Sequence, residues 1–349
     1  MGSSQLIGKR TRGLIDPVAT LASADEALER LTGATPQPVE DFRALKHHYA
    51  RECRAYYSVA ALSRRGVLED ELRSEAYAKL FRLRSALENS IIRDLDYCGA
   101  RSDLEKIWGS KSFFGVSAKQ GVSVRYALAS CVPTRTCGAR CYAHDGRDRE
   151  IHHLFRGALN YYFGKQFESS SVKDRRRLLD ILSKAIEFGV SAAREDCLLA
   201  ERELGIRRLP RIRFSHVGEI AATPQFANAV AQEIRSIDPE ISCVIYTRHP
   251  RARELDSKLF VINFTLEGDD DPRSRWAPAS ARIVSSAWDG RLSSIADINF
   301  LEHHVGEVAE ADGSGVVCPV TLDHGRNASC DIARCQLCFV PPPPRRSGP

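Results

Sequence analysis

Apolar side chains in the first third of the chain recur at the spacing of one face of an α-helix. The i, i+3, i+4 pattern runs over residues 40–63 and again over 69–95, with Gly66 between the two stretches. We therefore expect two long helices that form a hairpin. A shorter helix is expected ahead of them, with Ser23 as its N-cap and Gly33 at its end.

After residue 111 the pattern changes to short apolar runs that alternate with helical periods. The expected strands are 113–116, 122–129, 211–215, 243–247, 259–265, 281–287 and 295–300. The expected helices are 150–163, 172–202 with an interruption at Gly189, 224–236 and a short one at 251–255. Strands joined through helices predict an α/β fold with a mostly parallel sheet, open or closed into a partial barrel.

These patterns divide the chain into five parts. We expect a flexible arm at 1–22, a helical segment at 23–111, an α/β domain at 112–310, a cysteine-rich segment at 311–340 and a disordered polyproline tail at 341–349.

Composition and charge narrow the functional classes. The chain has 349 residues, of which 43% are hydrophobic, and a net charge of +5. It is long enough to bury a sizeable core without disulfides. Its basic residues are spread along the sequence, so a nucleic-acid partner is possible but not indicated. No apolar stretch of about 18 residues is present, which predicts a cytoplasmic protein with no membrane partner.

The cysteines carry the strongest chemical signal. An odd total of 11 cysteines in a reducing compartment favours metal or cluster binding over a disulfide framework. Cys131, Cys137 and Cys141 have a CX5CX3C spacing on a loop that follows an expected strand. Three thiolates can hold one face of a metal centre and leave one coordination position open, or accept a fourth ligand such as His144 around zinc.

A second cysteine group lies near the C-terminus. Its members are Cys318, Cys330, Cys335 and Cys338, in a CX11CX4CX2C pattern. Four such ligands suit a structural zinc or a [4Fe–4S] cluster, and the spacing does not separate the two. The remaining cysteines considered are interpreted as small buried side chains, namely Cys53, Cys98, Cys197 and Cys243.

Four segments resemble the phage gene product eighty-eight family and its distant radical-SAM-like relatives. In chain order they are Cys137-Gly-Ala-Arg-Cys141-Tyr142-Ala143 with the helix that carries Arg156 and Asn160, Arg211-Ile-Arg-Phe-Ser215-His216-Val217-Gly218-Glu219, Tyr246-Thr247-Arg248, and the closing Cys-Pro…Cys…Cys-X-X-Cys-aromatic pattern. The resemblance covers about residues 112–340. The spacing CX5CX3C differs from the usual CX3CX2C of radical SAM enzymes.

The resemblance implies a radical-SAM-like partial barrel and a cofactor site. In such enzymes three cysteines hold a [4Fe–4S] cluster whose open iron binds the amino and carboxylate groups of S-adenosylmethionine. By this analogy Gly218 and Glu219 would hold the methionine amino group. Ser215 and His216, at the end of the same expected strand, are further candidate cofactor-binding residues.

Two hypotheses remain open from the sequence. The first is an enzyme with one or two [4Fe–4S] clusters that uses S-adenosylmethionine on an unknown substrate. The second is a binding module without catalysis, stabilised by zinc or a cluster and associated with nucleic acid. The two cysteine groups could also form a single shared site.

Several histidines and one arginine are further candidates for binding residues. Arg248 and His249 follow an expected strand and could bind an anionic group, with a surface role favoured. The pairs His47-His48, His152-His153 and His303-His304 are interpreted as structural, because adjacent side chains on a helix are not expected to face each other.

Overall fold

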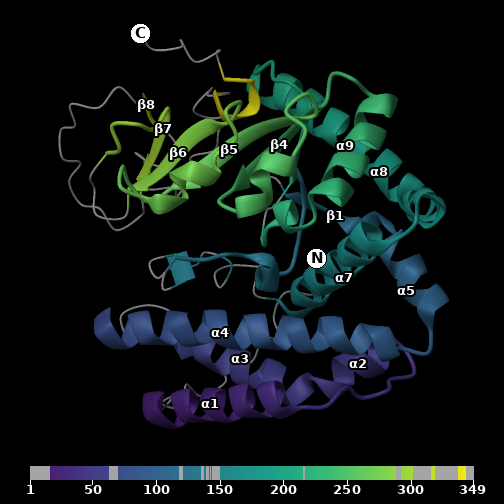
Figure 1. Cartoon of the computed structure of the whole chain (residues 1–349), viewed down its shortest axis with the longest axis vertical. Coiled ribbons are helices and arrows are strands. Elements are labelled where there is room, and N and C mark those ends of the chain that lie inside the picture. The colour runs from purple at the N-terminus through teal and green to yellow at the C-terminus, as the bar shows by residue number, and fades with distance from the viewer. Residues whose placement is uncertain are drawn as a thin grey trace, which may run out of the picture.

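The computed structural model describes residues 16–62, 70–117, 121–134, 137–138, 141, 143, 150–214, 217–287, 292–301, 316–318 and 337–342. These residues form a mixed α/β fold with N-terminal helices and an eight-stranded, mostly parallel sheet (Figure 1). The α/β class and the parallel sheet are therefore confirmed. In the described part of the chain, no helix is both long enough and apolar enough to cross a membrane.

The N-terminal helices are α1 (Pro17–Gly33), α2 (Phe42–His48), α3 (Ala50–Leu62) and α4 (Asp70–Asp94). In Figure 1, α1, α3 and α4 lie side by side as a layer, and each contacts the other two. Helix α4 also contacts α7 (Ile151–Ser169) and the 3-10 turn η3 (Leu128–Ser130). The expected hairpin of helices is thus present. Gly66, the expected break, lies outside the described residues.

Two boundaries in this region differ from expectation. The first helix begins at Pro17 and not after Ser23, because the Asp16 side chain accepts hydrogen bonds from the backbone amides of Val18 and Ala19. The stretch 40–63 is divided at Tyr49 into α2 and α3. The buried hydroxyl of Tyr49 donates to Asp94 Oδ2 at 2.7 Å, which ties this division to the end of α4.

The eight strands follow one another in the sheet in the order of the sequence. They are β1 (Phe114–Ser117), β2 (Gly121–Val124), β3 (Arg211–Phe214), β4 (Ser242–Thr247), β5 (Phe260–Leu266), β6 (Arg282–Ala287), β7 (Ile298–Leu301) and β8 (Val316–Val317). β1 and β2 are antiparallel, and every later neighbour pair is parallel. The expected strand over 122–129 ends at Val124, where the chain leaves the ladder.

Helices connect the parallel strands. These are α7 (Ile151–Ser169) and α8 (Val172–Leu204) between β2 and β3, and α9 (Pro224–Ile237) between β3 and β4; α5 (Arg101–Trp108) precedes β1. The expected interruption of α8 at Gly189 is absent. Gly189 instead allows the Phe114 ring to pack closely against the helix, since a Cβ at this position would lie 2.6 Å from the ring. The short helix expected at 251–255 is the 3-10 turn η7 (Pro250–Glu254).

Alternation along the strands gives the sheet two different faces. Ile212, Phe214 and Ile245 are buried in the main core together with apolar residues of α8 and α9. Right-handed crossovers between strands in sequential order place such helices on one face. The opposite face carries Arg211, Arg213 and Arg282, which the register places on the same side, and is called the arginine face below.

The C-terminal segment lies on the arginine face. The 3-10 turn η9 (Leu337–Phe339) contacts β4 and β5. Asn263 Nδ2 donates to the carbonyl of Cys338 at 3.0 Å, and Ser242 Oγ donates to that of Phe339 at 2.8 Å. The chain end thus covers the starting half of these strands and leaves their carboxyl ends to other segments.

Candidate metal centre

The first cysteine group begins where β2 leaves the sheet. Beyond Val124 the chain still pairs with the segment after β3, because the Tyr126 amide donates to the Val217 carbonyl at 2.7 Å. The 3-10 turn η3 (Leu128–Ser130) follows and delivers Cys131. Cys131 therefore lies at the carboxyl ends of β2 and β3, the edge at which parallel sheets usually carry their sites. We call this region the carboxyl edge.

The structure brings Cys131, Cys137 and Cys141 together at the carboxyl edge. Cys131 and Cys141 belong to a small apolar cluster with Leu128 and Val217, and all three thiols are free. Burial raises the pKa of each thiol, that of Cys141 to about 12. The charges of the other two thiols raise the pKa of Cys131 further, so the three are electrostatic neighbours.

Closely spaced ligand atoms are found elsewhere. Among the described residues, Glu150, His152 and His153 are the potential ligand groups whose atoms lie within 4.8 Å of one another, and Cys131, Cys137 and Cys141 do not form such a group. Thiolate ligands suit either zinc or an iron–sulfur cluster, and the arrangement of the three sulfurs does not separate the two.

A buried ion pair on α4 holds both ends of the cysteine loop. Arg84 and Glu88 are almost fully buried, and Arg84 Nε lies 3.0 Å from Glu88 Oε1. Glu88 Oε2 accepts from the Ala129 amide at 2.8 Å, ahead of Cys131. Arg84 Nη1 donates to the Ala143 carbonyl at 2.7 Å, beyond Cys141. The helical segment, whose role the sequence left open, thereby positions the cysteine loop.

Gly218 and Glu219 lie beside the cysteines. Gly218 has φ +75°, and a Cβ there would lie 2.4 Å from the Ala127 carbonyl oxygen, so this close approach requires glycine. The Glu219 amide donates to Ser130 Oγ at 2.7 Å. The turn after β3 is thus fastened to η3, one residue before Cys131.

The Glu219 side chain is buried and incompletely paired. Its Oε1 accepts from the Arg248 amide at 3.2 Å. Its Oε2 is buried and has no hydrogen-bond partner among the described residues. Burial raises the pKa of Glu219, and hydrogen bonds from Thr247 and the Arg248 amide oppose that shift. An additional donor, above all a cationic one, would satisfy this carboxylate.

Arg248 connects the ends of β4 and β5 to the cysteine loop. Its Nη1 donates to Glu267 Oε1 at 3.2 Å, and Thr134 donates to the same oxygen. Thr134 Oγ1 in turn accepts from the Cys137 amide at 2.9 Å. The Arg248 charge lowers the pKa of Cys137, against the larger effect of burial. The surface role favoured for Arg248 is wrong, because its side chain is only 13% exposed and pairs with Glu267.

Sequence reasoning missed Arg84, Glu88, Thr134 and Glu267. Arg84 and Glu88 have the i, i+4 spacing of a helix ion pair, but nothing in the sequence indicates that this pair is buried. Glu267 lies two residues after the expected strand 259–265. Its position near the end of a strand was the one sequence feature that could have indicated a role at the site.

The described members of the second cysteine group lie elsewhere. Cys318 and Cys338 are buried in one apolar cluster with Ile298, packed against Tyr246 and Phe300 on the arginine face. The first group lies at the carboxyl edge, so these described cysteines occupy a different part of the sheet. Cys330 and Cys335 lie outside the described residues, as do the candidate cofactor residues Ser215 and His216.

The cysteines interpreted as structural fall into two classes. Cys53 and Cys243 are buried in the core, as expected. Cys98 and Cys197 are only partly buried, and Cys197 Sγ contacts the Arg208 carbonyl at 2.8 Å.

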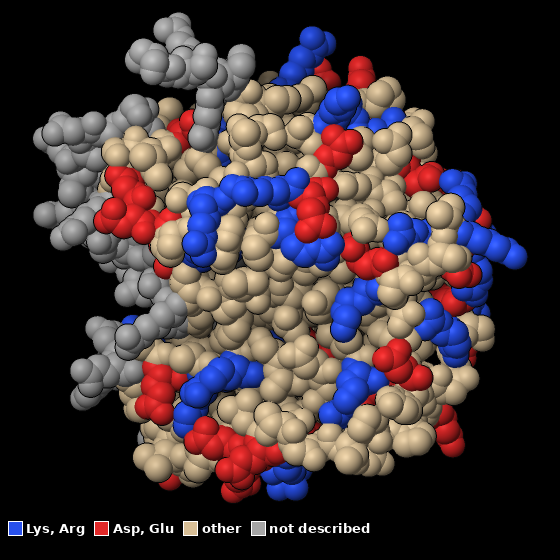
Figure 2. Space-filling view, viewed as in Figure 1, with Lys and Arg blue, Asp and Glu red and all other residues tan. Residues whose placement is uncertain are grey.

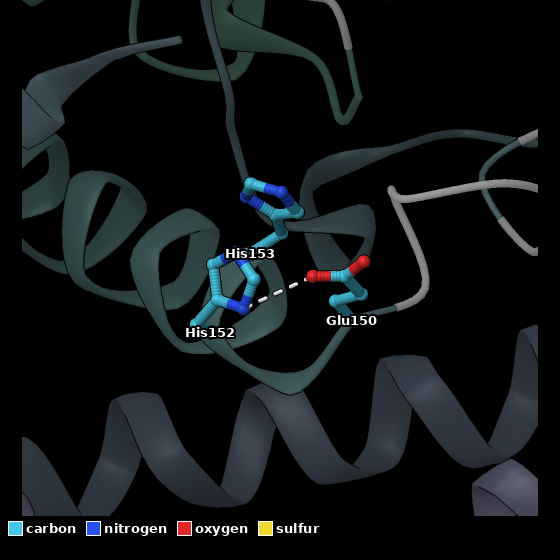
Figure 3. Close-up of side chains that lie close together, drawn as sticks. All are labelled: Glu150, His152 and His153. Atoms are coloured by element: carbon cyan, nitrogen blue, oxygen red, sulfur yellow. Dashed lines mark ion pairs between the residues drawn. The ribbon is translucent and has the colours of Figure 1, made fainter. Parts of the chain in front are cut away.

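Another group of potential ligands lies at the start of α7 (Figure 3). The rings of His152 and His153 have centroids 3.9 Å apart, so the expectation that adjacent side chains do not meet is wrong for this pair. Glu150 lies 3.4 Å from His152 Nδ1. However, burial lowers the pKa of His152, and the charges of Arg156, Arg125 and Lys46 lower it further, against the opposing charge of Glu150. The surrounding cations are an unfavourable setting for a dication.

Comparisons with known proteins identify no similar protein. No protein-family model, curated protein or solved structure matches the chain.

Proposed function

We propose that this chain is an iron–sulfur protein of radical-SAM-like type, with a [4Fe–4S] cluster held by Cys131, Cys137 and Cys141 at the carboxyl edge. The observation that carries the proposal is the grouping of three thiols from one loop, that of Cys141 buried and those of Cys131 and Cys137 partly buried, beside a buried carboxylate with one oxygen unpaired among the described residues. Thiolate ligands favour iron–sulfur or zinc, and the resemblance of the cysteine loop to radical-SAM-like proteins favours the cluster.

The surroundings fit a negatively charged centre. Arg248 is buried beside Cys137, and the Arg84 charge lowers the pKa of Cys141, so two guanidinium groups offset thiolate charge. Burial keeps the thiols protonated in the metal-free chain, and metal binding would displace those protons. The apolar residues Leu128 and Val217 would shield the centre from water.

Three cysteine ligands leave one iron of a cubane without a protein ligand, and the proposal assigns that position to S-adenosylmethionine. Glu219 is placed to hold the ammonium group of the cofactor, since its Oε2 is buried without a partner among the described residues. Gly218 supports this role by letting the turn approach Ala127 closely. When bound, the cluster would supply the electron for reductive cleavage of the cofactor, which starts radical chemistry on a substrate still to be identified.

The fold is compatible with this proposal. Parallel strands in sequential order, with α8 and α9 on one face, form the arrangement from which a partial barrel is built. We propose that the sheet curves as such a partial barrel and that Cys318, Cys330, Cys335 and Cys338 bind a second cluster on the arginine face.

The nucleic-acid alternative has less support in the charge distribution. On the face shown in Figure 2, basic and acidic side chains are interspersed and form no broad basic patch. The basic run on α8 is engaged within the protein, because Arg175 donates to the carbonyls of Phe167 and Glu168, and Arg177 pairs with Glu105. Such pairing leaves fewer charges for a phosphate backbone.

The test is an anaerobic purification in which iron, sulfide and zinc are quantified and a visible spectrum is recorded. The intact chain is expected to carry iron and sulfide with broad absorption near about 400 nm. The triple variant C131A/C137A/C141A should lose about half of the iron if the second group binds its own cluster. The matched control Cys197→Ala should keep all of it. Zinc alone in the intact chain, or full iron in the triple variant, would contradict the proposal.

A further inference from the structure

Three arginines project from one face of the sheet, and two of them are used by the C-terminal segment. The Arg211 guanidinium lies 3.9 Å from the Phe339 ring centroid. Arg282 Nη2 donates to the Val340 carbonyl at 3.1 Å, and its Nη1 lies 3.4 Å from Asn263 Oδ1. These two arginines fasten the chain end to the sheet.

The third arginine, Arg213, is engaged differently. Its guanidinium lies 4.6 Å from the Tyr246 ring centroid, a cation–π contact. Its Nε is buried and has no hydrogen-bond partner among the described residues.

Such an arrangement is unfavourable unless a ligand completes it. A buried donor without an acceptor costs about 1–3 kcal/mol, and more when the group is charged. The planar guanidinium edge matches the two oxygens of a carboxylate or phosphate. The residues that pair with Arg213 in register, Ser123 and Val244, carry no carboxylate.

The position of Arg213 suits a ligand between the two cysteine groups. It is the third residue of β3, one position before the carboxyl edge. The Tyr246 ring that it contacts lies 6.3 Å from the Phe300 ring, and Tyr246 and Phe300 both pack against the cluster that holds Cys318 and Cys338. Arg213, Tyr246 and Phe300 are only partly buried, so solvent reaches this part of the arginine face.

We propose that Arg213 binds the anionic group, a carboxylate or a phosphate, of a small ligand that lies on the arginine face beside Tyr246 and Phe300. Tyr246 holds the guanidinium from one side, so its two-pronged edge is presented to the anion. The aromatic rings offer an apolar surface to the remainder of the ligand. This assignment deepens the proposed function by naming the substrate class, but it depends on no iron.

The test measures binding of three probes to the full chain by calorimetry and thermal shift. The probes are inorganic phosphate, acetate and S-adenosylmethionine. At least one is expected to bind the intact protein, and Arg213→Gln should weaken that binding at least tenfold. Arg213→Lys should give an intermediate affinity, because it keeps the charge and loses the paired donors. The control Arg207→Gln removes an exposed arginine and should change nothing.

The probes identify the source of the anion. Dependence of phosphate or acetate binding on Arg213 assigns the site to a substrate of that class. Dependence of S-adenosylmethionine binding alone assigns it to the carboxylate of the cofactor. Unchanged affinity of every probe in Arg213→Gln, or no binding of any probe to the intact chain below about 10 mM, overturns the proposal.

Two further readouts separate this proposal from misfolding and from the cluster. Without ligand, Arg213→Gln should unfold at the same temperature as the intact chain or higher, because an unsatisfied buried donor is removed. A lower unfolding temperature would show a structural role and contradict the assignment. Iron content should be unchanged in Arg213→Gln, so loss of anion binding with full iron is a result for Arg213 alone.

Discussion

The buried pair Arg84–Glu88 on α4 gives the sharpest prediction about how the helical segment serves the site. Both side chains are almost fully removed from solvent, and each bonds one end of the cysteine loop. Replacing Glu88 by Gln leaves the Arg84 charge buried without its counter-ion. Loss of one partner of such a pair costs about 3–5 kcal/mol.

The double variant R84M/E88L separates stability from positioning. Replacing a buried pair by apolar side chains of similar volume is often neutral for stability. The free energy of unfolding should therefore return to within about 1 kcal/mol of the intact chain. Iron content should stay low, because nothing in this variant accepts from the Ala129 amide or donates to the Ala143 carbonyl.

The assay combines urea unfolding with iron quantification on the same anaerobic preparations. The control is Arg176→Gln, which breaks the exposed pair with Asp180 and should cost about 0–1 kcal/mol with iron unchanged. If R84M/E88L regains stability and also keeps all of its iron, the cysteine loop does not depend on α4 for its position, which contradicts the role assigned to the pair. If Glu88→Gln is as stable as the intact chain, the pair is not buried in solution.

Three further predictions concern the carboxyl edge. Gly218→Ala should lower the free energy of unfolding, measured in urea, by about 3 kcal/mol, because of the positive φ and the clash with the Ala127 carbonyl. The control Gly205→Ala, with open space around it, should lower it by about 1 kcal/mol. Equal costs would show that the close approach is absent. His249 accepts a hydrogen bond from the Arg251 amide through Nδ1, and burial lowers its pKa from 6.5 to about 4. Its contribution to the stability of the fold is therefore present above pH 6.5 and is lost as pH falls towards 4. We expect a loss of about 2 kcal/mol over that range, reduced in His249→Asn, and a pH profile identical in both proteins would exclude this role. Arg248→Gln should lower the midpoint potential of any bound cluster, because a positive charge next to Cys137 is removed; an unchanged or higher potential in a redox titration would contradict the assigned position.

The sequence predicted the sheet better than the loops. Strands 211–215, 243–247 and 259–265 were located to within about one residue because their apolar runs are bounded by turns and helices. The start of α1 was missed because Asp16 and Pro17 form a capping signal, with the N-cap Asp16 seven residues ahead of the expected Ser23. The strand over 122–129 was too long, since apolar character alone does not show where the chain leaves the ladder to form η3.

The site was only partly predictable. Cysteine spacing identified Cys131, Cys137 and Cys141 as one group, and in the structure the three thiols are electrostatic neighbours; their binding of a metal stays a prediction. The roles of Arg84 and Glu88 depend on contacts across more than forty residues of sequence, which periodicity does not contain. Arg213 was read as an ordinary strand residue, because an unsatisfied donor becomes visible only when its neighbours are placed.

The central claim is that Cys131, Cys137 and Cys141 bind a cluster without help from the second group. The most direct measurement is the iron and sulfide content, after anaerobic reconstitution, of the variant C318A/C330A/C335A/C338A. We expect about four iron and four sulfide per chain. Adding Cys131→Ala to this variant should remove them again. Absence of iron from the four-cysteine variant, or retention of iron after Cys131→Ala, would contradict it.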